Sequence, residues 1–65
     1  MELVSRINEV IREKGYRKSW VAEQIGVSRQ QLGNWSRGTS YPPLPKAFEL
    51  ARLLDVEITD LWAPI

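Results

Sequence analysis

The positively charged side chains of this sequence gather in its middle third. Residues 12–37 contain six basic residues against two acidic ones, a net charge of +4, whereas the whole chain has a net charge of only +1. The basic residues are Arg12, Lys14, Arg17, Lys18, Arg29 and Arg37. Clustered cations are the electrostatic signature of a surface that binds a polyanion such as nucleic acid. The simpler interpretation is a solvated helical surface, and charge alone does not decide between the two.

The composition excludes most catalytic and metal chemistry. The sequence contains neither Cys nor His, so zinc sites, thiol nucleophiles and imidazole bases have no residues to form them. We expect no cofactor, no metal and no small-molecule ligand. A chain of 65 residues fits one domain, spanning 1–65, and is too short for the concave site that an enzyme needs. We therefore predict that the protein is not an enzyme.

No part of the sequence is suited to a membrane. No apolar run approaches the roughly 18 residues of a membrane span, and charged residues stand where a signal peptide would have its apolar region. We expect a cytoplasmic protein that makes no membrane contact.

Helical periodicity predicts five helices. Apolar residues recur at intervals of three and four, and a glycine follows each of the first three segments as a stop signal. The predicted helices cover residues 2–14, 18–25, the stretch between Ser28 and Gly38, 46–54 and 57–62, and the fourth can begin as early as residue 44. Prolines place a turn or loop at 39–45. No segment alternates long enough for a strand, so the predicted fold is all-α.

The spacing between the second and third helices is typical of a helix-turn-helix. A short helix ends at Gly26, and Ser28 is a good N-cap for the next helix. Ala22 is small enough for close packing of the two helices, and Val27 can enter the core. The same pattern occurs in other helical bundles, so by itself it is modest evidence.

A longer run of residues identifies a family. Val21 to Pro42, V-A-E-Q-I-G-V-S-R-Q-Q-L-G-N-W-S-R-G-T-S-Y-P, resembles the helix-turn-helix of the Cro and phage-repressor family, also called XRE or lambda-repressor-like. The resemblance extends to I-R-E-K-G upstream, to P-x-L at Pro42 to Leu44, and to L-A-R-L-L-D-V-E-I-T-D-L-W near the end. It implies a five-helix DNA-binding domain that reads an operator as a homodimer.

The resemblance also implies base-contacting residues on the third helix. Arg29, Gln30 and Asn34 occupy the positions that the family uses for this purpose, with Gln31 as a less certain addition. Arg suits guanine and Gln or Asn suits adenine, because each pair forms two hydrogen bonds. The alternative is that these are merely exposed polar side chains.

The resemblance also implies a set of phosphate contacts. Such contacts fix the register of the protein on DNA but carry no sequence information. The predicted set is Arg17, Lys18, Ser28, Arg37, Thr39, Ser40 and Tyr41. Arg17 stands where a capping Ser or Thr is common, so the second helix has a weak N-cap unless a phosphate lies nearby.

The tryptophans have packing and binding interpretations. We expect Trp35 to lie in the core, and we favour packing over DNA contact for Trp20. Leu61, Trp62 and Ile65 form an apolar end that predicts a dimer interface. The equal alternative is that Trp62 closes the core of a single chain.

Two departures from the family pattern stand out. The Arg and Glu that often link the first and third helices are replaced by Ile11 and Ser36. Because both partners are absent together, no buried charge is left unpaired. Asp55 replaces a frequent Gly at the end of the fourth helix, which predicts a small loss of stability.

Two functions are compatible with this sequence. The first is a sequence-specific regulator, expected to be a repressor of a pseudo-palindromic operator. The second is a protein-interaction module, antitoxin-like or an adaptor, that retains the fold without operator binding. The polar residues at 29, 30 and 34 favour the first, since an interaction module would more often carry apolar or acidic side chains there.

Overall fold

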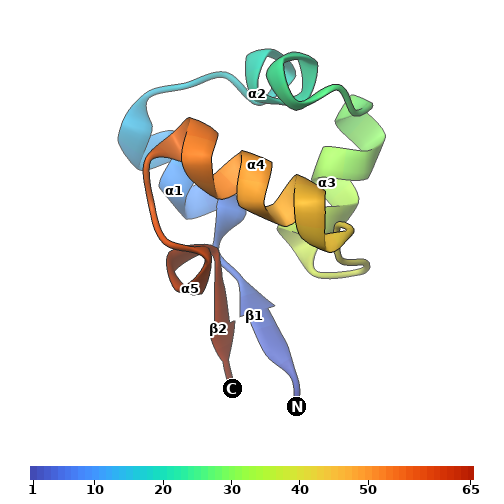
Figure 1. Cartoon of the computed structure of the whole chain (residues 1–65), viewed down its shortest axis with the longest axis vertical. Coiled ribbons are helices and arrows are strands. Elements are labelled where there is room, and N and C mark those ends of the chain that lie inside the picture. The colour runs from blue at the N-terminus through green and yellow to red at the C-terminus, as the bar shows by residue number, and fades with distance from the viewer.

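Five helices and a short two-stranded ribbon make up the fold in the computed structural model, which describes residues 1–65 (Figure 1). In chain order they are β1 (Leu3–Ser5), α1 (Ile7–Lys14), α2 (Lys18–Ile25), α3 (Arg29–Arg37), α4 (Leu44–Leu54), α5 (Ile58–Leu61) and β2 (Trp62–Pro64). The five predicted helices are therefore confirmed. The ends of the first and last differ from the prediction.

The two ends of the chain form a ribbon instead of extending the flanking helices. β1 pairs antiparallel with β2, with Leu3 opposite Pro64 and Ser5 opposite Trp62, and Figure 1 shows both strands projecting from the helical body. The predicted helical fold class is confirmed, with five helices. The prediction of a helix from residue 2 is wrong, and the short ribbon is an addition that was not predicted from the sequence. Apolar residues at 3, 4 and 7 suit a helix or a strand, and the partner strand lies almost the whole chain away.

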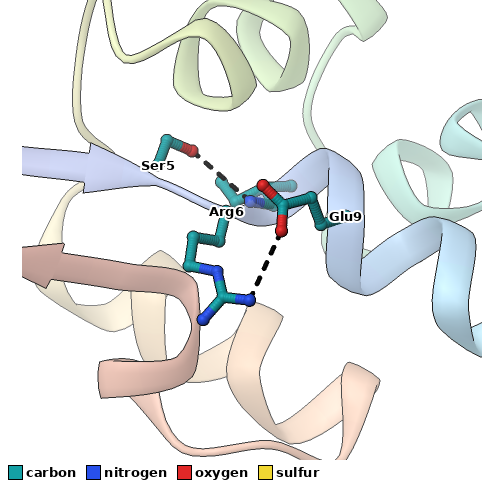
Figure 2. Close-up of polar contacts among 4 residues, drawn as sticks. Ser5, Arg6 and Glu9 are labelled. Carbon is teal, nitrogen blue, oxygen red and sulfur yellow. Dashed lines mark hydrogen bonds and ion pairs between the residues drawn. The ribbon is translucent and has the colours of Figure 1, made fainter.

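The start of α1 has its own polar contacts. The Ser5 Oγ accepts a hydrogen bond from the Ile7 amide at 3.5 Å, and Arg6 pairs with Glu9 at 3.3 Å (Figure 2). The Arg6 amide also donates to the Leu61 carbonyl at 2.8 Å. These bonds end the strand and begin the helix within two residues, which is why α1 starts at Ile7.

The remaining helix ends follow the sequence signals closely. α1, α2 and α3 each end at a glycine in the left-handed conformation. α4 begins at Leu44 with Pro45 in its first turn, as the earlier of the two predicted starts requires. α5 is shorter than predicted, because Trp62 leaves the helix and enters β2.

The core is built around α4. This helix contacts α1, α2 and α5, and Figure 1 shows it crossing in front of α1 with α2 above and α3 to one side. The side chains with almost no exposed surface are Ile7, Val21, Leu32, Leu50, Leu54 and Leu61. They come from all five helices, so α2 and α3 are fixed by the same core that holds the rest.

No helix of the protein has both the length and the apolar character that crossing a bilayer requires.

Candidate nucleic-acid interface

The turn between α2 and α3 has the geometry that the sequence predicts. Gly26 has φ 73°, and the Val27 amide donates to the Ala22 carbonyl at 3.0 Å. Ala22 is buried, and Val27 packs against the core. A left-handed residue at this point costs little only for glycine, so Gly26 sets the direction in which α3 leaves the turn.

A capping box begins α3. The Ser28 Oγ accepts from the Gln31 amide at 3.0 Å, and the Ser28 amide donates to the Gln31 Oε1 at 3.4 Å. The predicted N-cap is confirmed. Gln31 uses one lone pair of its carbonyl oxygen in this cap, so its NH₂ group is wholly free for another partner, and the Ser28 hydroxyl keeps a proton to donate.

The two faces of α3 differ in burial. Leu32, Trp35 and Ser36 face the core, with Trp35 only 3% exposed, so the expected core position of this tryptophan is confirmed. Arg29 and Gln30 are exposed and have no hydrogen-bond partner within the protein. The outer face of the helix therefore begins with two polar side chains that are free to meet a ligand.

The second half of this outer face is already hydrogen-bonded. Arg37 donates to the Asn34 Oδ1, and Thr39 donates through its hydroxyl to the Asn34 carbonyl at 3.1 Å. The Arg37 guanidinium folds back over Gly33, where an added Cβ would lie 3.2 Å from its Nη1. The Asn34 Oδ1 therefore keeps one lone pair for a base, although it shares this oxygen with Arg37, and its NH₂ group keeps both protons.

The basic residues of the middle third, which include the four cations predicted to contact DNA, lack acidic partners. The two ion pairs of the protein are Arg6–Glu9 and Lys46–Glu49. None of the six basic residues of 12–37 therefore forms an ion pair with an acidic side chain. All six are exposed. The N-cap of α2 is Arg17, which makes no capping hydrogen bond with its side chain, as the sequence predicts. The amides at this helix start are open to an anion.

The residues after α3 divide into two groups. Thr39 and Ser40 are exposed and follow the C-terminal end of α3. Tyr41 is 52% exposed and lines an apolar groove together with Leu44 and Ala47. Its ring therefore lies beside apolar side chains, although its hydroxyl was predicted to contact phosphate.

The predicted dimer residues at the C-terminal end are mostly unavailable. Leu61 is fully buried and Trp62 is 6% exposed, so both belong to the core of one chain; Ile65 alone is exposed. This burial favours the alternative in which Trp62 closes the monomer core. The sequence could not show it, because the inward direction of Trp62 depends on the β1–β2 pairing.

Two features of the interface were not predicted. The Lys46 Nζ donates to the Ile25 carbonyl at 2.7 Å, which ties α4 to the end of α2. Tyr16 and Trp20 are in contact with ring centroids 4.9 Å apart and ring planes tilted by 39°, and both stay about two-fifths exposed. The first contact spans 21 residues and leaves no periodic signal. The second joins Tyr16, in the loop before α2, to Trp20 on α2, so helical periodicity does not predict it either.

The substituted family pair is accommodated without charge. Ile11 is 3% exposed and joins the core, and the Ser36 Oγ donates to the Leu32 carbonyl at 2.8 Å. Ile11 therefore needs no polar partner, and Ser36 finds its acceptor within its own helix. A buried ion pair at these positions would instead need two charged side chains in matched geometry.

Comparison with known families decides the identity of the fold. A helix-turn-helix family model matches residues 7–61, most of the chain. The chain belongs to the XRE or lambda-repressor-like helix-turn-helix family. Members of this family are DNA-binding regulators and not enzymes, so the present chain is a DNA-binding transcription regulator.

Solved structures agree with this assignment. A proposed DNA-binding protein from Bacteroides fragilis is 33% identical, with a TM-score of 0.84 and coverage of 92% of this chain and 97% of that one. The restriction-modification controller C.AhdI from Aeromonas hydrophila is 29% identical, with a TM-score of 0.75 and coverage of 85% and 83%. No curated protein sequence matches the chain.

A third structure includes nucleic acid. SinR, described as the master regulator for biofilm formation and solved in complex with DNA, is 31% identical, with a TM-score of 0.72. The match covers 82% of this chain and 86% of the SinR chain.

Proposed function

We propose that this regulator is a cytoplasmic repressor, with residues 1–65 acting as one domain that binds a pseudo-palindromic operator as a homodimer. α3 lies in the major groove, and the repressor blocks transcription by occupying a promoter. The observation that carries the proposal is the outer face of α3, where Arg29 and Gln30 are exposed and unpaired while Leu32 and Trp35 anchor the helix from behind.

In this proposal the base contacts come from the outer face of α3. Arg29 and Gln30 read bases first, because they need no rearrangement. Asn34 reads a base when Arg37 moves from its amide to a phosphate oxygen. Gln31 supports the helix start through its cap and can donate hydrogen bonds through its NH₂ group.

Phosphate contacts flank this face on both sides. Arg17 and Lys18 supply them at the open start of α2, and the other groups lie around α3: Ser28, Arg37, Thr39, Ser40 and Tyr41. All of these side chains are hydroxyl or cationic hydrogen-bond donors, which suit the anionic oxygens of a phosphate. A two-fold dimer would place two such surfaces about 34 Å apart, one helical turn of DNA.

The test is a selection of bound sequences from a random duplex pool at near-physiological salt. We expect an enriched pseudo-palindrome whose half-site centres lie about one helical turn apart. Enrichment of a single half-site would overturn the dimer. No enrichment would overturn operator binding and favour the protein-interaction module instead.

A further inference from the structure

The ammonium group of Lys46 holds the end of α2 from another helix. Its Nζ donates to the Ile25 carbonyl at 2.7 Å and lies 3.4 Å from the Glu49 carboxylate on its own helix. The bond to Ile25 joins residues 21 positions apart, and the Lys46 side chain keeps 35% of its surface exposed. Partners on two helices therefore hold this ammonium group in one place.

The Ile25 carbonyl has no partner on the backbone. The amides that close α2 donate elsewhere, the Gly26 amide to the Glu23 carbonyl and the Val27 amide to the Ala22 carbonyl. The last carbonyls of any helix lack donors within that helix, and they give its C-terminal end a partial negative charge. A cationic side chain with an N–H donor meets both needs.

α2 supplies no such cation itself. The last turn of α2 has no basic residue and contains Glu23, whose charge has the wrong sign for a helix C-terminus. Every other helix of eight or more residues has a basic residue in its last turn: Arg12 and Lys14 in α1, Arg37 in α3 and Arg52 in α4. Lys46 therefore provides for α2, from α4, what the other helices provide for themselves.

The same ammonium group lies at the turn before α3. A Cβ at Gly26 would be 3.8 Å from the Lys46 Nζ, and Gly26 is the residue at which the chain turns towards α3. The apolar contacts of the core have no preferred direction, whereas a hydrogen bond of this length is directional. The bond therefore fixes how the end of α2 is oriented on α4, and with it the start of the turn.

We propose that Lys46 is a positioning residue for sequence reading by α3. By closing the end of α2 it fixes the turn at Gly26, and therefore the angle at which Arg29 and Gln30 approach the bases. The inference rests on the proposed function in one respect, which is that α3 reads base sequence. A base contact with two hydrogen bonds needs its side chain placed within about 0.5 Å. Loss of the ammonium group therefore lowers the preference for the operator more than the general affinity for DNA.

The first experiment compares K46M with two other variants. K46M keeps an unbranched side chain but removes the ammonium group, and K46R keeps a cationic N–H donor. The matched control is R52M, which removes the same charge from the same helix. Arg52 lines a hollow together with Ile25 and Glu49, but its side chain makes no hydrogen bond or ion pair. Fluorescence anisotropy measures the affinities for the selected operator and for a random duplex.

We expect the ratio of operator affinity to random-duplex affinity to fall at least about fivefold in K46M, because misplaced side chains lose part of their base discrimination. The ratio should stay close to the wild-type value in K46R and in R52M. A partly unfolded variant loses affinity for both duplexes by the same factor, so the ratio does not depend on stability. A ratio in K46M equal to that in R52M, or a ratio in K46R as low as that in K46M, would overturn the proposal.

The second experiment works without DNA and follows amide hydrogen exchange in the wild type and in K46M. The Val27 amide, which donates to Ala22, reports opening of the turn, and the amide of the buried Ile11 in α1 reports opening of the core. We expect protection to fall about tenfold more at Val27 than at Ile11. Equal losses at the two amides would show a general effect on stability and overturn the positioning role.

The two experiments separate this inference from the function on which it rests. If no DNA sequence is enriched by the wild type while K46M loses protection selectively at Val27, operator reading fails and the control of the turn by Lys46 stands. If a sequence is enriched and K46M keeps the wild-type preference for it, the operator function stands and the role of Lys46 fails.

Discussion

The two faces of α3 meet different demands. The inner face, with Leu32 and Trp35, is buried in the hydrophobic core. The outer face begins with Arg29 and Gln30, which are exposed and whose side chains make no hydrogen bond within the protein. The inner face therefore determines whether the domain folds, and the outer face is free to vary for DNA. Changes on the two faces should separate stability from sequence preference.

The inner face predicts the largest effect. W35A should lower the free energy of unfolding by about 3 to 5 kcal/mol, because truncating a buried aromatic side chain leaves a cavity. A domain of this size has only about 3 to 10 kcal/mol of stability in total, so much of the protein should unfold at 37 °C. Thermal denaturation followed by circular dichroism measures this. A melting temperature like that of the wild type would contradict the core position of Trp35.

A substitution on the outer face should have a smaller effect, on DNA affinity and not on stability. R29A should leave the melting temperature nearly unchanged, since exposed substitutions usually alter stability by less than about 0.5 kcal/mol. Its affinity for the selected operator should fall by about 1 to 3 kcal/mol, with little change for a random duplex. Fluorescence anisotropy with both duplexes measures the difference. Equal losses on both would remove Arg29 from base reading.

A substitution at the start of α2 should lower the affinity for DNA without changing the preference for one DNA sequence over another. K18A should weaken binding to operator and random duplexes by similar factors, because a phosphate contact carries no sequence information. The slope of log affinity against log salt should become shallower by about 1. Titrations at several salt concentrations test this, with R52A as a control on α4, because Arg52 is exposed and lies outside the basic cluster of 12–37. An unchanged slope would place Lys18 away from the DNA backbone.

The smallest predicted effect lies far from DNA. Asp55 ends α4 at φ 57°, and it is the one non-glycine residue with positive φ. D55G should raise the free energy of unfolding by up to about 1 kcal/mol, because glycine adopts this conformation without steric cost. Chemical denaturation measures it, and a loss of stability would show that the Asp side chain stabilises this turn.

The sequence predicts the helix-turn-helix well because its signals are local. Gly26, the Ser28 cap and the positions of Leu32 and Trp35 lie within ten residues of one another, so spacing alone places them. The exposure of Arg29 and Gln30 follows directly from that placement.

Long-range contacts are what the sequence does not predict. The pairing of Ser5 with Trp62 turns the N-terminal segment into a strand and buries Trp62, which removes it from the predicted dimer surface. The bond from Lys46 to the Ile25 carbonyl is equally remote in sequence. Neither contact can be predicted from the local pattern of polar and apolar residues, because the two partners lie far apart in the sequence.

Asn34 illustrates an intermediate case. Its place on the outer face follows from helical spacing, but its hydrogen bond with Arg37 depends on a side-chain conformation over Gly33. The sequence therefore predicts where this residue lies and not which of its atoms are free.

The central claim is that the outer face of α3 reads base sequence, and a paired selection tests it most directly. Random duplex pools are selected in parallel with the wild type and with Q30A, and the two enriched motifs are compared position by position. We predict that the variant loses preference at one base pair in each half-site and keeps the other positions. Identical motifs from the two proteins would contradict the claim.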